Sequence, residues 1–362
     1  MNNLNTAALA PSSLPQPCED VPSQPLSTPP SPADRWTAWD AFVEKTPETG
    51  FMQSSWWVDF RSVCGFENFG ITLRDGKDIV GGAAVLKFWY AEDACFYYIQ
   101  DGPVLPGDPL FGEEVFHAIL QGIDERREHE QCAVSHLRLE PRWPHLPGFV
   151  SGFRPIPPLT DHYLEPRDTR CIDLRPSEDA ILAQMKPKGR YNIHVAQRHG
   201  VSVIEDTSAQ GLADFQTLYE ETADRQGMAA KPPDYFETFL SFLSPGHRGS
   251  LFFAEYQGMR LASALVVYFG RTATYFYGGS RDLHRNVMAP YLLHFEVMRE
   301  AKTLGHEWYD LWGIAPPNEP DHPWQNFSAF KGKFGGVEVH SVPTLDFVYD
   351  PAAYVQYTTL NG

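Results

Sequence analysis

Alternation of hydrophobic and polar positions in residues 71–139 predicts a small α/β unit. Two apolar runs flank Asp75-Gly76, a dipeptide that commonly forms the tight turn of a β-hairpin. Further along, Val115, Ile119 and Ile123 recur at the spacing of one helix face. The predicted elements, in order, are strands at 71–74, 79–88 and 95–99, a helix at 113–130 and a strand at 134–139.

The same order of elements returns roughly 180 residues later, in residues 251–312. Pro290 suits the first position of a helix in which Leu293, Val297 and Ala301 share one face. Repetition of one element order at a fixed offset indicates an internal duplication. We therefore expect two copies of one α/β domain, each with a mixed sheet and flanking helices. The second set of predicted elements comprises strands at 251–256, 261–269 and 272–277, a helix from 290 and a strand at 308–312.

The remaining segments suggest how the chain is divided. Residues 1–33 are rich in Pro, Ser and Gln, which is typical of a disordered tail. Helical patterns fill the section between the two copies, and the last residues are expected to return to the first copy. The predicted division is a tail at 1–33, a first domain at 34–168 plus 343–362, and a second domain at 169–342.

The composition is that of a globular protein. Hydrophobic residues make up 43% of the 362 residues, enough for two cores. The five cysteines are scattered without a C-x-x-C pair, and no H-E-x-x-H pattern occurs, so we expect neither a disulfide framework nor a metal site. No apolar run approaches the ~20 residues of a spanning helix. The net charge of −17 argues against nucleic-acid binding over the whole surface, but it leaves room for a local basic patch.

Four short motifs follow one another along the chain and together resemble those of a known family. Residues 186–201 (KPKGRYNIHVAQRHGV) resemble a signature of lysines followed by R-x-N-I and G-V. Residues 277–280 (YGGS), 309–314 (YDLWGI) and 330–335 (FKGKFG) resemble Y-G-A-S, Y-D-F-G-G-I and F-K-x-x-F-G. In this order, over roughly residues 36–350, they resemble the Fem family of peptidoglycan aminoacyltransferases.

The resemblance implies tandem domains of the GNAT-like (acyl-CoA N-acyltransferase) fold, with no cofactor. It implies transfer of Gly, Ala or Ser from aminoacyl-tRNA to an amine of a peptidoglycan precursor's stem peptide, which builds the interpeptide bridge. The acceptor would be a UDP-linked or lipid-linked muropeptide. No long charged helical pair is evident in the second copy, so the chain resembles the compact type without a coiled-coil arm. A cytoplasmic monomer is expected, and a lipid-linked acceptor would bring it to the inner face of the plasma membrane.

Lys331 is the expected catalytic residue. Aminolysis of an ester needs a cation or N–H donors at the developing oxyanion. By the resemblance, the lysine at this position stabilises the intermediate or binds the tRNA end, and Phe330 before it is expected to contact substrate. We expect residues 327–335 to form a loop, in which Lys333 is the rival cation and a solvated lysine is the plainer alternative.

Arg225 and Arg61 are expected to bind the phosphates of the acceptor. Arg225, followed by Gln226-Gly227, resembles a family Arg-Asp-Gly position with Gln226 in place of the acid. Arg61 follows Trp57 at the spacing of a family lysine. A guanidinium can make paired hydrogen bonds to phosphate oxygens, so the role would survive a Lys-to-Arg exchange. The alternative for each is an ordinary surface arginine.

Tyr277 and Tyr98 lie near the ends of equivalent strands in the two copies. Either hydroxyl could bind a uridine, sugar or phosphate group, and a half-buried strand tyrosine is the equally weighted alternative. Asp108 could accept a proton, although a loop aspartate is the plainer interpretation. Asp310, on an otherwise apolar strand, is expected to make structural hydrogen bonds.

The basic run at 186–199 leaves two interpretations open with equal weight: it could steer tRNA or another phosphate-bearing substrate, or it could be a solvated helix face.

Two other functions remain as alternatives. An acyl-CoA-dependent N-acyltransferase would hold pyrophosphate with the backbone N–H groups of a Gly-rich loop at a helix N-terminus. The equivalent loop, residues 285–290, has no glycine, and Pro290 has no N–H, which disfavours CoA. A non-catalytic protein that binds muropeptide or tRNA is the second alternative, and Lys331 within the motif set argues against it.

Overall fold

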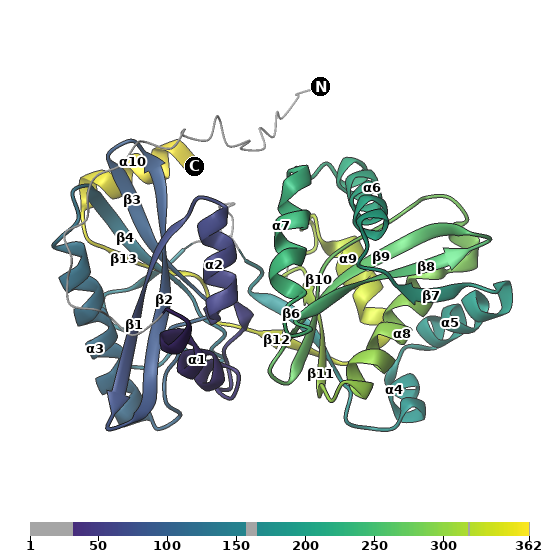
Figure 1. The fold of residues 1–362 in the computed structure, drawn as a ribbon, viewed down its shortest axis with the longest axis horizontal. Helices are drawn as coiled ribbons and strands as arrows, with labels where there is room; N and C mark the ends of the chain where they lie inside the picture. The colour runs from purple at the N-terminus through teal and green to yellow at the C-terminus, as the bar shows by residue number, and fades with distance from the viewer. Residues whose placement is uncertain (1–31, 157–164, 318, 362) are drawn as a thin grey trace.

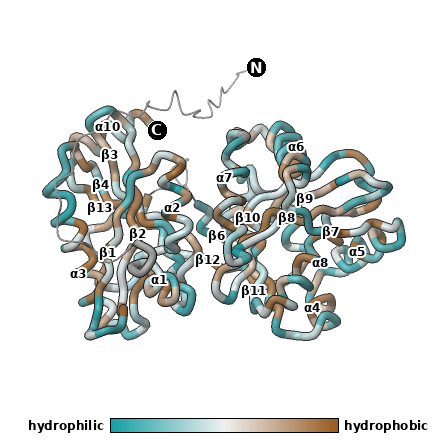
Figure 2. The backbone as a smooth tube through the Cα atoms, in the orientation of Figure 1, coloured by the Kyte–Doolittle hydropathy of each residue, from teal (hydrophilic) through white to brown (hydrophobic). Residues whose placement is uncertain are grey.

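The structure, a computed structural model of the chain, describes residues 32–156, 165–317 and 319–361. The chain forms two lobes that lie side by side (Figure 1), and their outer loops are mainly hydrophilic (Figure 2). The tail expected at residues 1–33 lies outside the described residues except for its last two, which begin α1 (Pro32–Val43).

The first lobe is built on a six-stranded mixed sheet in the order β1-β2-β3-β4-β13-β5. The hairpin predicted around Asp75-Gly76 is confirmed, because β1 and β2 pair antiparallel as far as Asp75 and Asp78. A helix, α3, connects β3 to β4, which pair in parallel. The C-terminal segment supplies β13, which pairs with β4. The elements are η1 (Phe51–Gln53), α2 (Ser55–Val63), β1 (Glu67–Asp75), β2 (Asp78–Ala91), β3 (Ala94–Gln100), α3 (Pro109–Arg127), β4 (Ala133–Glu140), β5 (Arg154–Pro155), β13 (Leu345–Val348) and α10 (Pro351–Asn361).

The second lobe repeats this plan in a seven-stranded sheet of order β12-β6-β11-β10-β9-β8-β7. Here α8 connects β10 to β11, which again pair in parallel, as β3 and β4 do. The α/β fold with tandem GNAT-like domains and mixed sheets is therefore confirmed. The elements are β6 (Asp168–Asp173), α4 (Glu178–Gln184), α5 (Pro187–His199), β7 (Ser202–Glu205), α6 (Ala209–Gln226), α7 (Pro233–Leu243), β8 (Gly249–Tyr256), β9 (Met259–Phe269), β10 (Thr272–Ser280), η2 (Arg285–Val287), α8 (Ala289–Thr303), β11 (Trp308–Gly313), α9 (Gln325–Lys331), η3 (Gly332–Phe334) and β12 (Val337–His340).

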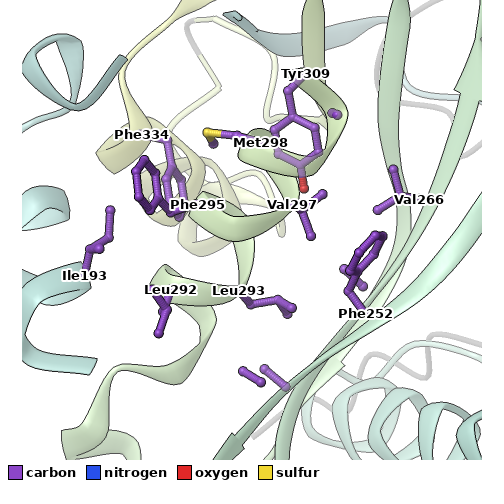
Figure 3. Packing of buried hydrophobic residues seen from close by; sticks show 14 of the residues in the cluster. Ile193, Phe252, Val266, Leu292, Leu293, Phe295, Val297, Met298, Tyr309 and Phe334 are labelled. Carbon is purple, nitrogen blue, oxygen red and sulfur yellow. The ribbon is translucent and has the colours of Figure 1, made fainter. Parts of the chain in front are cut away.

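Separate hydrophobic clusters cover the two faces of the second sheet. On one face α5 and α8 pack against the strands, and Figure 3 shows Ile193 of α5 near Leu292 of α8. On the other face α6 and α7 pack together with α2 of the first lobe. Trp57 of α2 lies 6.0 Å from the ring of Phe239 and 5.9 Å from that of Phe276. Because one apolar cluster contains side chains from both lobes, burial of its surface holds the lobes together.

The loop predicted at residues 327–335 is wrong, because the segment is mostly helical. It lies in α9 and then η3, and Gly335, with φ of 78°, follows as the first residue after the turn. Phe330 and Phe334 are four residues apart, and their rings pack 5.3 Å from each other beside His294 of α8. This spacing puts both rings on the side that faces the core, which favours a helix.

Candidate functional site

The site begins where two parallel strands separate. β10 and β11 pair only from Thr272↔Trp308 to Thr274↔Asp310, although β10 continues to Ser280 and β11 to Gly313. Beyond Thr274 and Asp310 the strands therefore leave backbone groups that the ladder does not satisfy. Such groups need other partners, or they remain free to bind a ligand.

A cavity of about 890 Å³ occupies this opening. Its walls include residues 275–278 of β10, residues 312–313 of β11 and Ile314 just beyond it, together with Tyr219 of α6 and Lys331 of α9. Tyr275 packs with the cluster under α8, whereas Phe276 and Tyr277 pack with the cluster under α6 and α7. The cavity therefore draws its walls from both faces of the sheet. Its volume lies in the range of a small-molecule site.

Lys331 is the buried cation of this cavity. Its side chain enters from the last turn of α9, and its Nζ donates a hydrogen bond of 2.6 Å to the carbonyl oxygen of Gly313. That carbonyl belongs to the part of β11 that has separated from β10. Burial lowers the pKa of Lys331 to about 8, while Asp310 opposes the shift. A protonated Lys331 has two more N–H donors for a group that enters the cavity.

Asp310 shapes the end of β11, as expected of a structural carboxylate. Its Oδ1 accepts a hydrogen bond of 2.8 Å from the backbone N–H of Trp312, whose φ of 63° is rare for a residue with a side chain. Its Oδ2 accepts from Arg142 of the first lobe at 3.1 Å, and Arg142 also lies 3.7 Å from Asp101. This ion triplet, with two buried aspartates and a partly exposed Arg142, crosses the lobe interface. Trp312, held by Asp310, lines the cavity.

Aromatic hydroxyls surround the other end of the cavity. Tyr277 lines it and is hydrogen-bonded to Tyr235 of α7 through their hydroxyls at 3.0 Å. Lys231, also in the wall, places its Nζ 5.3 Å from the ring of Tyr235. Burial and the neighbouring hydroxyl raise the pKa of Tyr277 well above its usual range, so Tyr277 is a neutral hydrogen-bonding group at any physiological pH.

Glu165 adds a carboxyl group to the wall where the lobes meet. Its Oε1 accepts a hydrogen bond of 2.9 Å from Gln100, and its backbone N–H donates to Glu140 at 3.2 Å. Burial raises the pKa of Glu165 to about 8, and the negative charges of Glu140 and Asp101 add to the shift. This edge of the cavity can therefore hold or release a proton near neutral pH.

The two arginines expected to bind phosphate lie outside the lining of the cavity. Arg225 projects from α6, where its guanidinium contacts Thr222 at 3.2 Å and Asp282 at 3.6 Å. Arg61 stacks 4.0 Å from the ring centroid of Phe66, and its Nε is buried without a hydrogen-bond partner. Arg61 is near enough to lower the pKa of Glu165, which places it on the same interlobe side.

The structure also places the other predicted residues. Phe330 lies outside the cavity wall and packs on Tyr291 and His294. Tyr98 is fully buried under α10 and donates its hydroxyl hydrogen bond to Glu140. Asp108 caps α3 through the backbone N–H of Phe111 at 2.9 Å. Lys333 lies in η3 and is half-buried. Of the predicted residues, Lys331 and Tyr277 line the cavity.

Sequence reasoning missed several wall residues, namely Glu165, Tyr219, Lys231, Tyr275 and Trp312. The sequence did contain a signal for Trp312. It lies two residues after Asp310, the only acid of the predicted strand at 308–312, and within the motif at 309–314. Glu165 and Lys231 lie in connecting segments, where periodicity gives no indication of which side chains turn inward.

The described parts of the chain contain neither a metal-binding cluster nor a membrane-spanning helix. No group of three or more His, Cys, Asp or Glu side chains among residues 32–156, 165–317 and 319–361 is arranged to hold a metal ion. None of the helices found in those ranges is long and apolar enough to cross a bilayer.

Known aminoacyltransferases and one family model resemble this chain. The model of the FemAB family matches residues 159–246 and 248–361. The lipid II:glycine glycyltransferase of Staphylococcus saprophyticus is 22% identical, over 88% of this chain and 92% of that protein. The UDP-N-acetylmuramoylpentapeptide-lysine N(6)-alanyltransferase of Weissella viridescens is 25% identical, over 88% and 95%. The crystal structure of FemX superposes with a TM-score of 0.79 at 18% identity, covering 88% of this chain and 96% of that one.

Proposed function

The chain belongs to the FemAB family, and from this premise we propose that it transfers an amino acid from aminoacyl-tRNA to an amine of a peptidoglycan precursor's stem peptide. Two relatives support the reaction type, since one is named a lipid II:glycine glycyltransferase and the other an alanyltransferase acting on a lysine. The donor is the aminoacyl ester of tRNA, and the acceptor is a UDP-linked or lipid-linked muropeptide. Action as a monomer is part of this proposal.

The buried ammonium of Lys331 carries this proposal. The acceptor's amine nitrogen attacks the ester carbonyl carbon, and the carbonyl oxygen becomes an oxyanion. Collapse of that intermediate forms the amide and breaks the bond to the ribose oxygen, which leaves as a hydroxyl after taking the proton lost by the amine. Lys331, with a pKa of about 8, is mostly protonated at pH 7 and can donate to the oxyanion. In a cavity shielded from water, such a donor acts more strongly than in solution.

The side chains around Lys331 suggest separate roles in binding. Tyr277 and Trp312 line the opening where the strands separate, and they would hold the acceptor's peptide beside Lys331. Arg61 lies on the interlobe side and Arg225 projects from α6, and each is expected to bind a phosphate of the acceptor. Phe330 would act indirectly, because its ring anchors α9 on Tyr291 and His294 of α8. Tyr98 is assigned no contact with substrate, because it is fully buried beneath α10.

The test measures transfer of label from charged tRNA. The protein is incubated with tRNA carrying labelled glycine, alanine or serine, and with a UDP-linked or a lipid-linked muropeptide; a parallel reaction contains labelled acetyl-CoA. We expect label on the muropeptide from tRNA, with kcat falling roughly 10²–10³-fold in Lys331→Ala, as when an oxyanion donor is removed. Lys333→Ala, two residues away and half-buried, is the matched control and should keep its rate.

Each alternative result has a clear meaning. Label that arrives only from acetyl-CoA would refute the proposed donor. Label from tRNA that persists in Lys331→Ala would keep the function and refute the role of Lys331. Absence of transfer to both acceptors would favour a binding protein.

A further inference from the structure

We propose that the exposed side of α5, defined by Lys188, Tyr191, His194 and Arg198, is the surface that binds the duplex acceptor stem of the donor tRNA. The proposal rests on the proposed function, because it assumes that an aminoacyl-tRNA delivers its ester to Lys331. These four residues recur at intervals of three and four, so they lie along one line of the helix. We call this line the α5 surface.

The α5 surface is positively charged within an acidic protein. Helix α5 contains no Asp or Glu, although the whole chain has a net charge of −17. Lys188, His194 and Arg198 are exposed, and in the described parts of the chain no carboxylate lies within ion-pair distance of any of them. Cations that no protein carboxylate neutralises are available for the phosphates of a nucleic acid, which release counterions when bound.

The position of α5 connects its charge to the catalytic lysine. The backbone N–H of Lys186, at the start of α5, donates a hydrogen bond of 3.0 Å to the carbonyl of Lys333 in η3. The Lys186 Nζ lies 3.8 Å from the position that a Cβ would take at Gly332. Gly332 follows Lys331 directly, so α5 begins beside the wall of the cavity and extends away from it for about 20 Å at 1.5 Å per residue.

The sheet separates α5 from the side where the acceptor would enter. Ile193 and Ala196 bury the inner side of α5 in the cluster that contains α8, and Figure 3 shows Ile193 near Leu292. The cluster of α6, α7 and α2 of the first lobe covers the opposite face of the sheet. Arg61 and Glu165 lie on the interlobe side, and Arg225 projects from α6, which covers the same face of the sheet. The donor and the acceptor react in one cavity, so each needs its own path of entry. Residues from both faces of the sheet line the cavity, so the two substrates can enter from opposite faces. The donor therefore fits the α5 side.

The chemistry of the α5 surface favours RNA over a lipid surface. A helix that lies in a membrane interface needs a free apolar side to insert. The apolar residues of α5, including Ile193 and Ala196, are buried against the protein core. Tyr191 is the exception at 60% exposure, and it stands among cations, 5.8 Å from the guanidinium of Arg198. Double-stranded RNA is recognised mainly through its phosphates and shape, which suits a line of cations on a rigid helix.

The test removes two charges from this surface. In Lys188→Gln/Arg198→Gln, binding of a fluorescent RNA minihelix with the acceptor-stem duplex and its single-stranded end is measured by anisotropy from 50 to 200 mM salt. Each phosphate contact contributes about 0.9 to the slope of log affinity against log salt. Loss of two contacts should lower that slope by about 1.8, so the fourfold rise in salt weakens wild-type binding roughly twelvefold more than variant binding. Lys45→Gln/Lys77→Gln removes two exposed charges from the first lobe and should leave the slope unchanged.

Transfer assays then locate the effect. For charged full-length tRNA we expect a raised KM and an unchanged kcat in the α5 double variant, while an aminoacylated trinucleotide without a duplex should react as with wild type. Unchanged minihelix binding would overturn the proposal, as would equal impairment of both donors. Loss of binding to phosphatidylglycerol vesicles with normal minihelix binding would assign the surface to a membrane instead. If wild type binds the minihelix through α5 but transfers nothing, the α5 surface stands and the proposed function fails.

Discussion

Replacing Lys331 by methionine should stabilise the protein at pH 7 and destabilise it at pH 10. Methionine has an unbranched, uncharged side chain that is one atom shorter than that of lysine. In the folded protein, burial lowers the pKa of Lys331 from 10.5 to about 8. At about 1.4 kcal/mol for each unit of pKa, keeping the ammonium charged in this cavity costs about 3 kcal/mol at neutral pH.

The substitution also removes one hydrogen bond. The Nζ of Lys331 is the donor to the Gly313 carbonyl at 2.6 Å, and leaving a buried acceptor without a donor costs about 1–2 kcal/mol. At pH 7 the variant should therefore be more stable than wild type by about 1–2 kcal/mol, the difference between the two effects. The variant should nevertheless lose transfer, so stability and activity would change in opposite directions.

The stability difference between wild type and Lys331→Met should change sign as the pH rises. Between pH 8 and pH 10.5 the unfolded lysine still binds its proton, whereas the folded one has released it, so wild-type stability rises with pH in this window. At pH 10 folding still costs about 0.8 kcal/mol, because the unfolded lysine is mostly protonated and must release its proton. The lost hydrogen bond, at about 1–2 kcal/mol, is larger, so the variant should be less stable than wild type by up to about 1 kcal/mol. Other titrating groups are common to both proteins and cancel in the difference.

The assay is urea unfolding followed by tryptophan fluorescence, at pH 7, 8, 9 and 10, for wild type and Lys331→Met. Trp308 and Trp312 on β11 report on the strand that accepts the lysine's hydrogen bond. Lys333→Met serves as the control and should differ from wild type by no more than about 0.5 kcal/mol at every pH. A difference for Lys331→Met that stays constant from pH 7 to pH 10 would refute the buried, charged lysine.

Three further predictions concern stability. Arg142→Ala should lower the free energy of unfolding by about 3 kcal/mol, because it leaves two buried aspartates without a counter-ion. Arg175→Ala breaks an exposed ion pair and should leave the urea midpoint almost unchanged. Gly335→Ala should lower the free energy of unfolding by more than about 2 kcal/mol, because the new Cβ would lie 2.4 Å from a carbonyl oxygen. Gly305→Ala, where φ is 92° and the space around the Cβ is open, should lower it by only about 1–2 kcal/mol. Thermal unfolding of both variants measures the difference. The pKa of Glu165 is raised to about 8, so Glu165 binds its proton more tightly in the folded protein than in the unfolded chain. As pH rises from 5 to 8, the free energy of unfolding of wild type should therefore fall by about 2–4 kcal/mol relative to that of Glu165→Gln. A difference in urea midpoints that does not change with pH would contradict this.

The sequence by itself determined the plan of the fold. Period-two alternation gave the strands, period 3.6 gave the main helices, and the repeated order of elements gave the two GNAT-like units. These signals are local, because each follows from which side of one element faces apolar surroundings. Motif order singled out Lys331 and Tyr277, and both line the cavity. The family could be recognised for the same reason, since its motifs are short and contiguous.

Tertiary structure decided what surrounds each candidate. Alternation places Tyr98 on one side of β3, but only the return of α10 from the far end of the chain buries it. The glycines around Lys331 suggested a loop, but packing of two phenylalanines against α8 makes the segment helical. Such outcomes depend on partners that are distant in sequence, and local patterns cannot identify them.

The properties of the cavity likewise exist only in three dimensions. Arg142 meets Asp310 across 168 positions of the chain, and Glu165 acquires its raised pKa from Glu140 and Asp101. Lys331 is an ordinary lysine in the sequence. Its lowered pKa arises because the separation of β10 from β11 creates a cavity, removes water from the ammonium and offers it the carbonyl of Gly313. Desolvation and the distance to other charges set the chemistry of a group, and both are fixed only when the lobes and strands have packed.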